Sequence, residues 1–256
     1  MSAFSVRPGG TLIFAAIAAL GAAGVRAQGP APLSDRALES LADDPATGSL
    51  LAELRGDFPD DWRTFKGTIV AMAKAGAPAE RIEARTHDLI GQIAVAHRAD
   101  VAAAPPAALV PLARAKAAVI RALSEENVRD CAAYGLNRLP RSARPSPATS
   151  NLMTLETIAY LKAARAGMDH PTAPEEVTDE DVGRLTDGMK ALKVKPTLVR
   201  SLISGGIAGA SAANQCAAGV GMFQAIADMN VHAAARWTRR LYVEPDPADA
   251  RKAPEG

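Results

Sequence analysis

Three side chains between residues 80 and 87 have types and spacing that could bind a metal ion. Glu80, Glu83 and His87 stand at positions i, i+3 and i+7, so they lie along one side of a helix. Carboxylates and imidazoles are metal ligands, and such a site would need further ligands from a neighbouring helix. The same spacing also suits an exposed Glu–His pair worth only a few tenths of a kcal/mol. We keep these three residues as a metal hypothesis beside that simpler interpretation.

The chain has only two cysteines, Cys131 and Cys216. In an oxidising compartment a lone pair most simply forms one disulfide, which would stabilise the fold by about 4 kcal/mol through loop entropy. The alternative is two buried free thiols, because cysteine packs well as a small apolar residue. The export signal described below favours the disulfide.

The sequence motifs of common enzymes are missing. The chain has no G-x-S-x-G, S-x-x-K, H-E-x-x-H, C-x-x-C or G-x-G-x-x-G pattern. Asp60 and Asp61 are adjacent, so on a helix their side chains diverge by about 100° and do not form one acid pair; they suit a helix start instead. His97 is predicted to be a packed, hydrogen-bonded histidine. We therefore predict no catalytic residue and no cofactor.

Hydrophobic residues recur every three or four positions through most of the chain, which predicts helix after helix. Proline and acidic residues mark one helix start at Pro59, and a capping-box-like sequence marks another at Thr178. The other expected helices include 78–103, 107–123, 124–134, 151–166, 196–204 and 209–243. Few aromatic residues, at 4% of the chain, argue against a β-sandwich or barrel. We expect an all-α, irregular multi-helix bundle of about eight to ten helices with one disulfide.

The N-terminus has the three parts of a secretory signal peptide. Arg7 precedes a 15-residue uncharged run, Thr11 to Val25, and Val25-Arg26-Ala27 offers small residues at a cleavage site. The run is short for a membrane span, although an uncleaved N-terminal anchor is the alternative. Cleavage after Ala27 would remove two arginines and no acid, which changes the net charge from +1 to −1. We expect a periplasmic or secreted protein.

A proline- and arginine-rich stretch, 138–149, is the clearest linker in the chain. It divides the sequence into a signal peptide at 1–27, an N-terminal helical lobe at 28–137, a C-terminal helical lobe at 150–243 and a flexible tail at 244–256. Whether the two lobes share one core is open at this point.

The uncharged stretch 201–227 is long enough to span a bilayer. Against spanning stand a Gly-Gly pair, three serines and the polar pair Asn214-Gln215 near its middle. A buried helix whose small residues let neighbours approach closely explains the stretch better. Membrane association through 201–227 is the second alternative. Our main expectation is that the protein does not associate with the membrane after signal cleavage.

The near-zero net charge gives no electrostatic case for nucleic-acid binding. Export, a helical build and the missing enzyme motifs together indicate a non-enzymatic interaction protein of the cell envelope. Its partner would be an unknown protein or envelope component. A metal-binding protein or metal-dependent enzyme using Glu80, Glu83 and His87 is the alternative.

Overall fold

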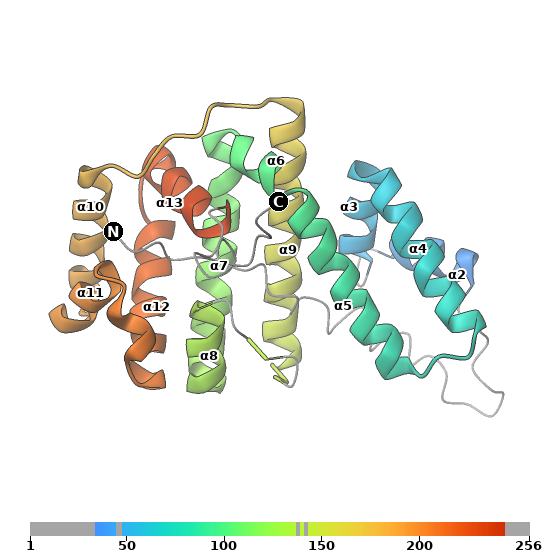
Figure 1. Cartoon of the computed structure of the whole chain (residues 1–256), viewed down its shortest axis with the longest axis horizontal. Coiled ribbons are helices and arrows are strands. Elements are labelled where there is room, and N and C mark those ends of the chain that lie inside the picture. The colour runs from blue at the N-terminus through green and yellow to red at the C-terminus, as the bar shows by residue number, and fades with distance from the viewer. Residues whose placement is uncertain (1–33, 45–47, 137–138, 141–142, 244–256) are drawn as a thin grey trace, which may run out of the picture.

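The computed structural model describes residues 34–44, 48–136, 139–140 and 143–243. Over these ranges the chain is all-α, as predicted, with twelve α-helices, one 3-10 helix and no strand. Figure 1 shows how the helices are arranged. The helices are α2 (Asp35–Ala42), α3 (Ser49–Asp57), α4 (Pro59–Lys74), α5 (Ala79–Ala96), α6 (Arg98–Ala103), α7 (Pro106–Glu126), α8 (Val128–Gly135), α9 (Pro147–Asp169), α10 (Asp179–Ala191), α11 (Pro196–Ile203), η1 (Gly206–Gly209), α12 (Ala212–Ala227) and α13 (Val231–Val243). The predicted signal peptide and tail lie outside the described residues.

Several helix starts follow the local signals in the sequence. Pro59 opens α4, and Asp60 and Asp61 occupy its first turn, where the helix dipole favours acids. Thr178 and Asp181 form the predicted capping box of α10, each side chain accepting a hydrogen bond from the backbone of the other. These starts need no tertiary contact to be recognised, because the side chain satisfies backbone groups one turn away.

Two of the predicted long helices are broken, which accounts for the larger number of helices. The expected helix 78–103 divides at His97 into α5 and α6, and the expected helix 209–243 divides into α12 and α13. The second break is capped by Asn230, whose side chain accepts from the Ala233 backbone N–H at 3.0 Å. Neither break contains a glycine or proline, so the usual sequence signal of a helix end is missing.

Two predicted boundaries were wrong. Ser124 was expected to start a helix, but α7 continues to Glu126, and Asn127 instead caps α8 by accepting from the backbone of Arg129 and Asp130. The helix expected at 151–166 was also too short, because α9 continues through Gly167 to Asp169. A Cβ atom on Gly167 would come within 1.8 Å of the Asp100 carbonyl oxygen, so this glycine allows α6 and α9 to approach closely.

One hydrophobic core runs through helices on both sides of the predicted linker. The long helix α7 packs against α9, α8, α12 and α13, and α6 packs against α9. We call the helices α6–α13 the bundle; they pack around α7 and α9. The helices α2–α5 form an N-terminal layer at the right of Figure 1. The layer joins the bundle mainly through α3 on α9, together with the α5–α6 junction. The two predicted lobes therefore share one core, because α7 of the first lobe packs against α9 of the second.

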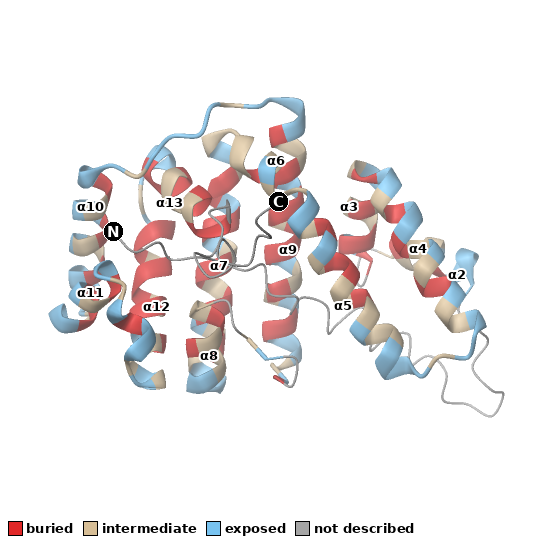
Figure 2. Ribbon diagram, in the orientation of Figure 1, coloured by how far each residue is buried: buried red, intermediate tan, exposed pale blue. Residues whose placement is uncertain are grey.

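Burial divides most helices into an inner and an outer face (Figure 2). In α4, Trp62, Phe65 and Ile69 are buried at helical spacing, and Phe58, which precedes the helix, is buried as well. In α12 the buried residues include Cys216, Met222 and Phe223, as the buried-helix interpretation of 201–227 predicted. Among the described residues, no helix is both long and apolar enough to cross a membrane.

Candidate functional site

The predicted metal ligands all lie on α5 in the N-terminal layer. His87 Nε2 lies 3.8 Å from Glu83 Oε1, whereas Glu80 is exposed. Within the described ranges, no group of three or more histidine, cysteine or acidic side chains could hold a metal ion. The structure therefore adds no converging ligand to Glu80, Glu83 and His87, and the metal hypothesis gains no support from the geometry.

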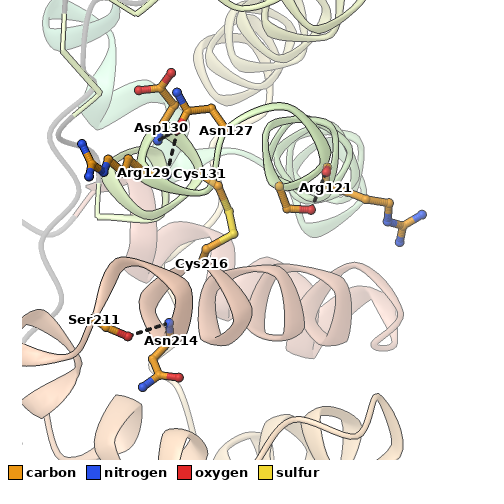
Figure 3. The surroundings of a disulfide bond; sticks show 9 residues. Arg121, Asn127, Arg129, Asp130, Cys131, Ser211, Asn214 and Cys216 are labelled. Carbon is orange, nitrogen blue, oxygen red and sulfur yellow. Dashed lines mark hydrogen bonds between the residues drawn. A yellow bond between two sulfur atoms is a disulfide. The ribbon is translucent and has the colours of Figure 1, made fainter.

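The predicted disulfide is present between Cys131 of α8 and Cys216 of α12. The two Cα atoms are 5.2 Å apart, and Figure 3 shows the bond crossing from one helix to the other. Both cysteines are buried. The bond therefore ties together two elements that lie on opposite sides of the predicted linker.

The two adjacent acids of α4 take separate partners, as their helical spacing predicted. Asp60 pairs at the surface with Arg63, whereas Asp61 Oδ2 lies 2.7 Å from His97 Nε2. The other nitrogen of His97, Nδ1, lies 2.8 Å from Asp100 Oδ2. Burial alone would lower the pKa of His97, but its hydrogen bonds to Asp61 and Asp100 outweigh burial and raise that pKa. His97 is the packed, hydrogen-bonded residue that was predicted.

A buried polar cluster in the bundle escaped the sequence analysis. Lys116 Nζ lies 3.6 Å from Glu156 Oε1 and 3.6 Å from the centre of the Tyr134 ring. Tyr134 and Tyr242 both donate to Glu156, the latter at 2.6 Å. The cluster joins α7, α8, α9 and α13. One signal could have revealed it: a lysine interrupts the apolar stripe of α7 between Ala113 and Ile120.

The environment of this cluster is apolar and closed. Its four side chains belong to residues that are no more than 7% exposed. Burial lowers the pKa of Lys116 against the attraction of Glu156. Burial, followed by the charge of Glu156, raises the pKa of Tyr242 well above its ordinary value. Since these groups present no open face to a substrate, we interpret the cluster as a polar connection between four helices.

Two arginines of α13 also bind across the bundle. Arg236 donates to both carboxylate oxygens of Asp181 at 2.7 and 2.9 Å, and these bonds lower the pKa of Asp181. Arg239 donates to the carbonyl oxygens of Ala102 and Ala104 at 3.0 and 2.6 Å. It therefore satisfies carbonyl groups at the end of α6.

A groove of about 590 Å3 lies between α7, the α10–α11 connection and α12. Its volume is within the range of small-molecule sites. Its apolar wall includes Leu192, Val194, Leu198 and Val220. Cys216 also lines the groove, so the disulfide holds one wall against α8 (Figure 3).

Three cationic residues, Arg121, Lys193 and Lys195, line the same groove, and none of its described lining residues is acidic. All three are exposed. Among the described residues, none of them has a carboxylate within ion-pair distance, in contrast to the neighbouring Lys190, which pairs with Asp187 at 3.0 Å. Within the described ranges, the positive charge of the groove is therefore not neutralised by an ion pair.

The position of Lys193 follows from the way α10 ends. The backbone N–H of Lys193 donates to the carbonyl oxygen of Lys190, and the N–H of Val194 donates to the carbonyl oxygen of Met189. These two bonds form the Schellman pattern. This pattern requires a left-handed residue, and Lys193 has a φ of 59°, where glycine is usual. At the end of α4 the same pattern has Gly76 at that position, with a φ of 72°.

Val194 anchors this connection against α12. A Cβ atom on Gly221 would lie 2.3 Å from Val194 Cγ2, so the absence of a side chain at Gly221 makes room for the valine. Lys193 and Lys195 stand on either side of this anchored residue in the sequence. Sequence analysis missed the groove because its α7 wall, at Arg121 and Ser124, is more than 60 residues away from the other walls, which begin at Leu192.

Comparisons of the chain with protein-family models, with curated proteins and with solved structures give no match. The groove is thus characterised by its own residues, and we take it as the candidate ligand site.

Proposed function

We propose that this chain is an exported, non-enzymatic binding protein of the cell envelope that holds its ligand in the groove between α7, α10–α11 and α12. One observation carries the proposal: a groove of about 590 Å3 with an apolar wall and with cations that form no ion pair to an acid within the described part of the chain. Apolar walls with a few polar groups are typical of sites that bind small molecules. The disulfide, which supports one wall, is compatible with an oxidising compartment.

The support for export comes from the N-terminal sequence and from the paired cysteines. Residues 1–27 have the order of a secretory signal. A disulfide persists in the periplasm or outside the cell, whereas cytosolic thiols are usually kept reduced. We therefore place the binding role in the periplasm or the extracellular space.

A single purification would test both parts of this proposal. The full chain is expressed with its own N-terminal segment in a bacterium that has a periplasm. The mass of the intact exported protein is then measured by native mass spectrometry. We expect a chain that begins at Gln28, has no alkylatable thiol and carries a small molecule in the groove. The variant Ala217→Phe, at an exposed position of the groove wall, should lose that molecule.

The matched control is Ala84→Phe, at an exposed position on α5, which should retain it. A protein that keeps residues 1–27 and stays in the cytoplasm would contradict export. A protein that binds nothing in the groove, either during purification or from envelope extracts, would contradict the binding role.

A further inference from the structure

We infer that the ligand is a single-chain amphiphile with an anionic head group, a carboxylate or a phosphate ester. The inference rests on the proposed function and specifies the ligand of the same groove. It combines two observations: the apolar wall formed by Leu192, Val194, Leu198 and Val220, and the cationic residues Arg121, Lys193 and Lys195 beside it. The wall would contact the chain of the ligand, and the cations would contact its head.

The apolar part of the groove offers surface that the fold leaves open. Leu192 is 45% exposed although its neighbour in the groove, Leu198, is only 8% exposed. A ligand chain lying on Leu192 would remove apolar surface from water, which favours binding roughly in proportion to the area covered. The α12 wall includes the small side chains of Ala213 and Ala217, which leave space in the groove.

The cationic part selects the charge of the head group. Arginine presents a planar fork that matches a carboxylate or phosphate, and lysine acts as a compact positive charge. The described groove lining has no acid to neutralise these three groups. A cationic ligand would therefore be repelled, and an uncharged one would gain only the apolar contact.

Lys193 gives a further reason to assign the head group to the cationic residues of the groove. A residue with a side chain at a left-handed position is strained relative to glycine, and α4 ends in the same pattern with Gly76. The fold therefore accommodates glycine at such a helix end, so the lysine side chain is not needed for the turn. Its charge is available for the groove.

The same geometry allows a variant that removes charge without harming the fold. Lys193→Gly suits the left-handed backbone. Lys195 is the N-cap of α11 and makes no side-chain capping bond, so Lys195→Ser introduces a preferred capping residue. The double variant should therefore be at least as stable as the original chain while it lacks two of the three cations.

The experiment measures binding to the purified full-length exported protein, freed of any retained ligand, by titration calorimetry. The probes are laurate, monododecyl phosphate, dodecyltrimethylammonium, dodecanol, acetate and inorganic phosphate, all below micelle concentrations. We expect both anionic amphiphiles to bind at least about tenfold more tightly than the cationic or uncharged chain, a difference that two or three charged contacts readily supply. The relative affinities of laurate and monododecyl phosphate identify which head group is preferred.

Acetate and inorganic phosphate should bind at least about 100-fold more weakly than the amphiphiles, because they lack the chain. The double variant Lys193→Gly/Lys195→Ser should bind the anionic amphiphiles about tenfold more weakly. Lys74→Gln/Arg81→Gln removes two exposed cations from the N-terminal layer and should leave the affinity within about twofold, since screening limits distant charges.

Equal or tighter binding of dodecyltrimethylammonium or dodecanol would overturn the inferred ligand class and leave the binding role intact. Equally tight binding of inorganic phosphate would overturn the requirement for a chain. If no probe binds but the exported protein carries another molecule that Ala217→Phe excludes, only this inference fails. If no molecule occupies the groove in either experiment, the proposed function fails with it.

Discussion

The N-terminal layer and the bundle are both built from amphipathic helices, but their polar contacts lie at different depths. In the layer, Arg55 reaches Glu39 and Asp43, and Lys66 reaches Glu39, with all these side chains at least one-quarter exposed. In the bundle, the side chains of Lys116 and Glu156 are 5% and 6% exposed. The bundle also contains the disulfide.

This difference shows how each region resists unfolding. Exposed ion pairs contribute little, so the layer depends mainly on its apolar stripe. A buried ion pair is costly to separate once it has formed, because one partner remains charged without water. We therefore expect the bundle to respond strongly to the loss of single polar groups or of the disulfide, and the layer to respond to His97, which joins α4 to the α5–α6 junction.

The largest effect should come from Glu156→Ala. This change removes the ion-pair partner of Lys116 and the acceptor of Tyr134 and Tyr242. We expect the free energy of unfolding to fall by about 5 kcal/mol, measured by urea denaturation followed by circular dichroism. Hydrogen exchange should increase in α7, α8, α9 and α13 before it increases in α2–α5.

The control is Glu53→Ala, which removes an ion pair to Lys162, a residue whose side chain is 61% exposed. It should cost less than about 1 kcal/mol. If Glu156→Ala costs no more than this control, the buried cluster does not distinguish the bundle from the layer.

The second prediction concerns the disulfide. Replacing both cysteines, Cys131→Ala with Cys216→Ala, should lower the free energy of unfolding by about 4 kcal/mol, because the unfolded chain regains the freedom that the closed loop removes. The measurement is denaturant unfolding combined with hydrogen exchange. Exchange should rise chiefly in α8 and α12, and the groove that Cys216 lines should lose ligand affinity.

Chemical reduction of the unaltered chain gives an independent version of the same test. It should reproduce the exchange pattern of the double variant. Equal acceleration throughout α2–α5 would mean that the disulfide stabilises both regions alike, contrary to the comparison.

The third prediction concerns the layer and has the smallest effect. His97→Ala removes the bonds to Asp61 and Asp100 and should cost about 2 kcal/mol at pH 5.5, because hydrogen bonds to charged groups are stronger than neutral ones. The folded pKa of His97 is raised. Its charge-dependent stabilisation is therefore fully present below the unfolded pKa of about 6.5 and is lost as pH rises through the folded pKa.

Stability curves of the two proteins between pH 5 and 9 provide the measurement. The difference between them should shrink as pH rises, and exchange in α4 should report it most clearly. His170→Ala, in an exposed position, should change little at any pH. A difference that grows with pH would show that neutral His97 is the stabilising form.

Local signals in the sequence determined the helical class and many of the helix starts. Pro59 with Asp60, and Thr178 with Asp181, act over one turn, so the physics that forms them is visible in a short window. The disulfide was also predictable, because two cysteines allow only one intramolecular pairing. The helix breaks at His97 and before Asn230 were not predictable, because neither has the glycine or proline that usually marks a helix end. Side-chain hydrogen bonds are found at both breaks instead.

Apart from the two cysteines, the tertiary structure alone decided which distant residues meet. Lys116 interrupts the apolar stripe of α7, but its contact with Glu156 depends on how α7 and α9 cross. The groove likewise requires α7, the α10–α11 connection and α12 to approach from separate parts of the chain. Helix formation follows short-range sterics and hydrogen bonding, whereas the choice of partners follows from burying every apolar face in one shared core.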